Sequence, residues 1–126
     1  MTPLEDHFRR PRNAGPMERA DVHVQVENPV CGDVMHLYLR LGASGRVGSA
    51  TFQVYGCPAA IAAGSLLTEL VAGHGVEDLA AIDEKRVDEA LGGLGGEKAH
   101  AAVLAADAVR AALAAASGSL RTRAGQ

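Results

Sequence analysis

The sequence predicts an α+β fold: a three-stranded antiparallel sheet with helices packed on one of its faces. Two observations lead to this prediction. Three segments with period-two alternation come first, and segments with helical spacing follow, so strands and helices do not alternate along the chain. The connectors between the strand segments are also short. Short connectors suit antiparallel neighbours, because parallel pairing needs a longer crossover.

A short helix over residues 3–9 is expected before the sheet. Thr2 can cap its start, and Pro3 suits its first turn. Glu5 and Asp6 lie where the positive end of the helix dipole favours carboxylates. A proline-containing connector then leads to the first strand.

Each predicted strand has apolar residues at every second position, which indicates a sheet with one buried face. In the second strand, Met35, Leu37 and Leu39 share one face, whereas His36 and Tyr38 lie on the other. The predicted strands cover residues 22–26, 34–41 and 47–55.

After Cys57 the apolar spacing changes to that of a helix. Pro58 suits the first turn of a helix that reaches about residue 72, and Gly73 ends it. Two short helices and a long alanine-rich helix are expected over residues 76–80, 83–90 and 97–116. We expect one domain over residues 1–117, followed by a flexible C-terminal tail over residues 118–126.

Composition narrows the classes of function. The 126 residues carry a net charge of −3, and the 12 Lys and Arg residues form no dense basic block, which argues against a nucleic-acid partner. No apolar run is expected to reach the roughly 18–20 residues that span a bilayer, and the start lacks the apolar stretch of a signal peptide. We therefore expect a cytoplasmic protein with no membrane partner. In such a compartment, the two cysteines are ligands, nucleophiles or core residues rather than a disulfide.

Four residues near predicted turns and helix starts carry the candidate chemistry: Cys31, Asp33, Cys57 and His100. Cys57 directly precedes a predicted helix, where free backbone N–H groups and the helix dipole favour a thiolate. A lowered pKa is therefore expected for Cys57. Cys31 and Asp33 flank a glycine in the turn between the first two strands, so both side chains can face one concavity.

Together these residues are four ligands of the kinds that Zn²⁺ accepts, at distances of roughly 2.0–2.3 Å. Thiolate ligands also suit iron–sulfur clusters. The simpler alternatives remain open at this point. Either cysteine could be a small buried apolar residue, Asp33 a turn residue, and His100 a surface residue of the last helix.

Several stretches of the chain carry recognisable motifs: residues 6–8 with 11–13, residues 28–33, residues 52–62 and residues 98–108. In this order, they resemble the opening motif, the first ligand motif, the second ligand motif and the last motif of the U-type iron–sulfur cluster assembly scaffolds. This is the NifU N-terminal-domain or IscU-like family. The resemblance covers roughly residues 4–114.

The resemblance implies a scaffold rather than an enzyme. Cys31, Asp33, Cys57 and His100 would bind Zn²⁺ or Fe²⁺, or a labile [2Fe–2S] cluster, for delivery to iron–sulfur acceptor proteins. A cysteine desulfurase would be the source of sulfur. Lys98 would pair with Asp33 or a thiolate when no metal is bound.

One position departs from the family pattern. The family has a third cysteine directly after the histidine of the last motif, where this chain has Ala101. Two alternatives therefore stand beside the scaffold. One is a sulfur-transfer acceptor that carries a desulfurase's persulfide on Cys57, and the other is a zinc-stabilised adaptor that has lost cluster chemistry. Self-association into a homo-oligomer also stays open.

Overall fold

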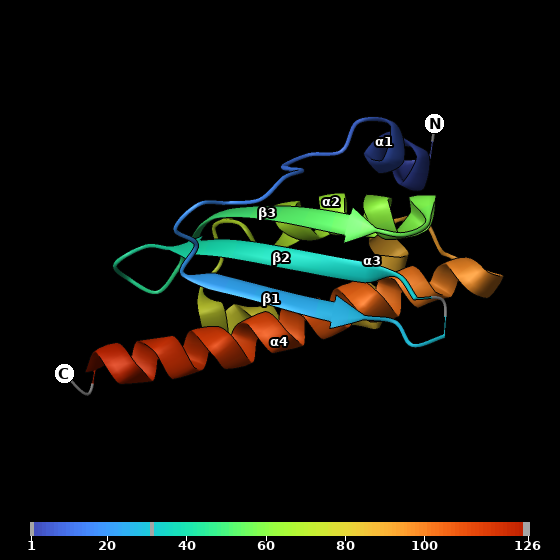
Figure 1. The fold of residues 1–126 in the computed structure, drawn as a ribbon. Helices are drawn as coiled ribbons and strands as arrows, with labels where there is room; N and C mark the ends of the chain where they lie inside the picture. The colour runs from blue at the N-terminus through green and yellow to red at the C-terminus, as the bar shows by residue number, and fades with distance from the viewer. Residues whose placement is uncertain (1, 31, 125–126) are drawn as a thin grey trace.

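The structure, a computed structural model, describes residues 2–30 and 32–124 and has the predicted α+β architecture. One antiparallel sheet, with strand order β1-β2-β3, is covered by helices on one face and open on the other (Figure 1). The elements are α1 (Pro3–Arg9), β1 (Val22–Glu27), β2 (Val34–Leu41), β3 (Val47–Tyr55), α2 (Pro58–Val71), η1 (Val76–Ala81), α3 (Glu84–Ala90), η2 (Gly96–Lys98) and α4 (Ala99–Ala124).

The alternation in the strands determines which face of the sheet is buried. Leu37 of β2 lies between Val24 of β1 and Phe52 of β3 in the ladder. Met35, Leu37 and Leu39 are completely buried against the helical layer. The faces predicted for the second strand are therefore confirmed.

Helix α2 packs on β3, and α4 packs on β1 and β2. Small side chains allow a close approach. The contact is tightest at Gly64 of α2, because a Cβ added there would collide with the ring of Phe52. This contact holds α2 close to the sheet, and with it the turn that leads from β3 into α2.

The N-terminal segment is bonded to α2 and to the edge of β3. His7 Nδ1 lies 2.8 Å from Ser65 Oγ, and the backbone N–H of Arg12 donates to the same oxygen at 2.8 Å. While it accepts from Arg12, the Ser65 hydroxyl can donate its own proton to His7 Nδ1. His7 Nε2 can then donate to Glu69 Oε1, 3.3 Å away. This arrangement requires a neutral His7 with its proton on Nε2.

Two details of the helices differ from the sequence-based expectation. Helix α4 continues to Ala124, past the predicted end at residue 116, so the described part of the predicted tail is helical. Residues Ala99–Ala116 also meet the length and apolarity of a membrane span, contrary to the expectation that no run would. Half of this window (50%) is buried inside the protein, because α4 is a core helix that packs on the sheet.

We predict that Gly64→Ala destabilises the protein, although alanine is normally the better helix former. The added methyl group would overlap the Phe52 ring, and overpacking of this kind costs about 1–3 kcal/mol. Urea unfolding monitored by circular dichroism measures the change. Gly42→Ala is the control, because its Cβ would make only an ordinary contact with Arg46 O at 3.7 Å. Equal stability of wild type and Gly64→Ala would contradict the predicted overlap.

We also predict that His7 makes folding stability depend on pH. Burial, followed by the positive charge of Arg12, lowers the pKa of His7. As the pH falls below about 6.5, the unfolded chain takes up the proton before the folded one. The contribution of His7 is therefore complete above that pH and is lost as the pH falls toward the lower pKa of the folded state.

The measurement compares melting temperatures at about pH 7.5 and about pH 5.5 in wild type and His7→Gln. From the higher to the lower pH, the melting temperature of the wild type should fall further than that of His7→Gln. The pKa of His36 is also lowered, first by burial and then by His23, so His36→Gln measures the share from that second histidine. An equal loss in wild type and His7→Gln would refute the role of His7.

Candidate functional site

The candidate site lies at one end of the sheet. The end of β1, the start of β2 and the end of β3 meet there, and α2 and α4 begin at the same end (Figure 1). Val34, the first residue of β2, pairs with Tyr55, the last residue of β3. The turns on either side of this pair therefore face each other across the end of the sheet.

The β1–β2 turn places Asp33 against the β3–α2 turn. Asn28 closes the first turn with its backbone, because its N–H donates to Asp33 O at 2.9 Å and its carbonyl accepts from Gly32 N at 2.7 Å. The Asp33 side chain is buried and packs against Gly56. A Cβ at Gly56 would lie 2.5 Å from Cγ and Oδ1 of Asp33, so the approach requires glycine.

Cys57 is the N-cap residue of α2, as expected, and the residue is exposed. Its pKa is nevertheless raised, which corrects the expectation of a lowered value. Partial burial of the thiol is the largest cause. The hydrogen bond with Asp33 and the negative charge of Asp33 also raise the pKa. The backbone N–H groups of Ala60 and Ala59 oppose the shift without reversing it. Cys57 is therefore a thiol beside a carboxylate.

The other predicted ligands are not joined to this pair by the described contacts. Cys31 lies outside the described residues. His100 is half-buried in the first turn of α4, where the sequence predicted it. Within residues 2–30 and 32–124, no three His, Cys, Asp or Glu side chains form a metal-binding group. The structure thus brings together Asp33 and Cys57, and the four-ligand site stays a prediction.

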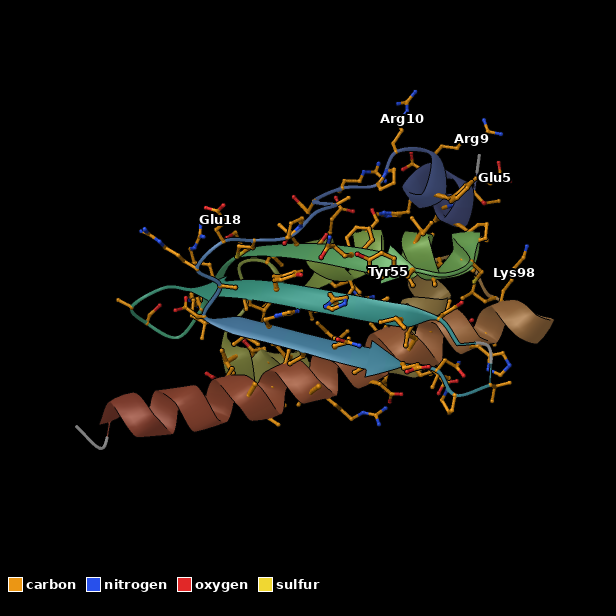
Figure 2. The ribbon with its side chains drawn as sticks, viewed as in Figure 1. Glu5, Arg9, Arg10, Glu18, Tyr55 and Lys98 are labelled. Carbon is orange, nitrogen blue, oxygen red and sulfur yellow. The ribbon has the colours of Figure 1, made fainter. Side chains whose placement is uncertain are left out.

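Among the described residues, Lys98 forms no ion pair with Asp33, one of its predicted partners. Figure 2 shows its side chain pointing away from the body of the protein, next to the start of α4. The side chain is exposed, and the ion pairs found among the described residues do not include it.

A second group of side chains was not singled out in the sequence. His23, His36, Tyr38 and Tyr55 lie together on the open face of the sheet, and His23 stacks on Tyr38 with ring centroids 4.3 Å apart. The signal was present as aromatic rings at outward positions of all three strands. Residues at such positions meet only once the strand register is known.

The fold and the site define a domain of the NifU type: a small α+β unit with a cysteine at the turn into its first core helix. Residues 3–121 match the family described as the NifU-like N terminal domain. The chain belongs to this family.

Within the family, the chain is similar to proteins named iron–sulfur cluster assembly scaffold protein IscU. It is 46% identical over 108 residues to two such proteins of Archaeoglobus fulgidus, covering 86% of this chain and 70% of each relative. It is 40% identical over 112 residues to IscU of Escherichia coli K12, covering 86% and 87%. These relatives are named as scaffolds and not as enzymes, in agreement with the expectation for this chain.

Solved structures support the fold. An N-terminal NifU-like protein from Brucella abortus superposes with a TM-score of 0.72 at 19% identity, covering 92% of each chain. A candidate SUF-system scaffold from Fervidobacterium islandicum gives 0.70 at 18% identity, covering 88% of this chain and 93% of the other. The predicted three-stranded sheet with its helical layer is therefore confirmed.

We predict that Asp33→Asn increases the reactivity of the Cys57 thiol near neutral pH. Removing the carboxylate charge removes one cause of the raised pKa, so a larger fraction of Cys57 becomes thiolate. Iodoacetamide labelling followed by peptide mass spectrometry gives the rate at Cys57 separately from Cys31. Asp107→Asn, in an exposed ion pair on α4, is the matched control. An unchanged or slower rate in Asp33→Asn would mean that the carboxylate does not suppress the thiolate.

Proposed function

We propose that this chain is a non-enzymatic scaffold of iron–sulfur cluster assembly. It takes up Fe²⁺ or Zn²⁺, or a labile [2Fe–2S] cluster, as cargo and delivers it to iron–sulfur acceptor proteins. The observation that carries the proposal is the Asp33 carboxylate beside the Cys57 thiol at the end of the sheet, in a chain 46% identical to proteins named as scaffolds.

The proposed ligands are Cys31, Asp33, Cys57 and His100. The described part of this set fits the cargo. Cys57 supplies a sulfur donor at an exposed turn, and Asp33 supplies a carboxylate directly beside it. Cys31 is two residues before Asp33 in the sequence, and His100 lies in the first turn of α4, which begins at the same end of the sheet. Sulfur, oxygen and nitrogen donors of this kind bind Zn²⁺, and the thiolates also suit iron–sulfur clusters.

The absence of a third thiol fits a site that gives its cargo away. Ala101 follows His100 and is 2% exposed, with its methyl group in the core. In our proposal this position supplies no donor, so the cargo is held by two thiolates together with harder oxygen and nitrogen ligands. Such ligands hold soft metals less tightly than thiolates do, which favours transfer.

The partners follow from this role. We propose a cytoplasmic protein that receives sulfur from a cysteine desulfurase and passes the assembled cargo to acceptors. The mild net charge of −3 gives no reason to expect a nucleic-acid partner.

The exposure of Cys57 favours sulfur transfer as a second candidate function. The Cys57 thiolate would attack the terminal sulfur of a desulfurase persulfide, forming a Cys57 persulfide and releasing the desulfurase cysteine as a thiolate. Incubation with a cysteine desulfurase, cysteine and Fe²⁺ without oxygen, followed by mass spectrometry and a visible spectrum, separates the two functions. One added sulfur on Cys57 without cluster colour supports transfer, whereas cluster colour supports the scaffold.

We predict that Cys57→Ala abolishes stoichiometric iron or zinc binding, because it removes the sulfur donor that lies beside Asp33. Elemental analysis and the visible spectrum of protein purified without oxygen measure the bound metal and the cluster. His74→Ala is the control, because His74 lies beside the start of β3, at the opposite end of that strand from Cys57. Retained binding of unchanged affinity in Cys57→Ala would overturn the assignment.

A further inference from the structure

Two histidines face each other on the open side of the sheet. His23 comes from β1 and His36 from β2, and the strand register places them diagonally, with His23 opposite Tyr38 and His36 opposite Gln25. Their rings stack with centroids 5.1 Å apart and an interplanar angle of 28°. His23 Nε2 and His36 Nδ1 lie 2.8 Å apart, so the two nitrogens share one proton.

This spacing is close to that of two ligands on one metal ion. At metal–nitrogen distances of about 2.0–2.1 Å, neighbouring imidazole nitrogens lie roughly 2.9–3.4 Å apart, depending on the angle between them. An ion could therefore replace the shared proton after the rings separate by a few tenths of an ångström.

We propose that His23 Nε2 and His36 Nδ1 form a two-imidazole site for a divalent transition metal ion of the Ni²⁺ or Cu²⁺ class, separate from Cys57 and Asp33. Imidazole is a preferred ligand of these ions. The site opens to solvent, since His23 is exposed and His36 half-buried, so water can complete the coordination.

The neighbouring side chains hold the two rings in place. Tyr38 stacks on His23, and the Tyr38 hydroxyl donates to Gln53 Oε1 at 2.7 Å. Tyr55 contacts His36 edge-on, with ring centroids 6.1 Å apart. The two imidazole rings are therefore already held in place, and ion binding costs them little further conformational entropy.

The protons also balance. In the neutral pair, one of the two facing nitrogens carries a proton. On metal binding this proton moves to the other nitrogen of its own ring, and no further reactant is needed.

The test is calorimetric titration of Ni²⁺ into the full chain near neutral pH. Wild type should show a saturable binding phase that disappears in both His23→Gln and His36→Gln. The same phase should persist in His74→Ala, which removes an exposed histidine elsewhere, and in Cys57→Ala. Near-ultraviolet absorption provides a second readout, because this phase should develop without a thiolate-to-nickel charge-transfer band.

Three results would overturn the proposal: no saturable phase in wild type, a phase that survives in either His23→Gln or His36→Gln, or a phase lost only in Cys57→Ala. Thermal melting checks that the glutamine variants are folded. The outcome is independent of the scaffold function, which is tested through Cys57 and not through the open face of the sheet.

Discussion

The close contact between α2 and the sheet is the constraint on which the rest of the structure depends. Gly64 allows the helix to lie directly on the Phe52 ring, and β3 passes into α2 through only Gly56 and Cys57. The position of the helix therefore determines where the Cys57 thiol lies. Because β2 starts beside the end of β3, the same packing brings Asp33 to that thiol. The geometry of the site is thus a consequence of how α2 packs on the sheet.

The electrostatics of the site favour an exchange between a proton and a metal ion. A thiol beside a carboxylate keeps its proton near neutral pH, because the charged pair would repel. A divalent cation reverses this preference, since it attracts both groups and stabilises the thiolate. Without metal, Cys57 therefore keeps its proton, and in the proposed scaffold the same carboxylate would serve as a ligand when an ion binds.

Much of the fold could be predicted from the sequence, because alternation in 34–41 and helical spacing after Pro58 report directly on which faces are buried. The direction of the Cys57 pKa shift could not be predicted from the sequence. It depends on Asp33, which is far away in the chain and meets the thiol only after β2 and β3 pair. The end of α4 was also missed, because alanine favours a helix without showing where packing stops.

The site itself was predicted in part. Sequence reasoning named Asp33 and Cys57, which the structure brings together, and placed His100 in the first turn of the last helix. The structural role of His7 was not predicted from the sequence. Its bonds to Ser65 and Glu69 join α1 to α2, and no local pattern reports such a contact between distant segments.

The N-terminal segment that follows α1 has a further consequence for association with other chains. Its backbone bonds to β3, with Phe52 N donating to Asn13 O at 3.0 Å and Gly15 N donating to Phe52 O at 2.8 Å. The segment thus occupies the outer hydrogen-bonding groups of Phe52, in the middle of that strand, and natural sheets use such cover to prevent unwanted strand addition. Among the described strands, β1 is paired on one side only. A strand donated by another polypeptide would therefore join this sheet along β1, on the side away from the turn that carries Cys57.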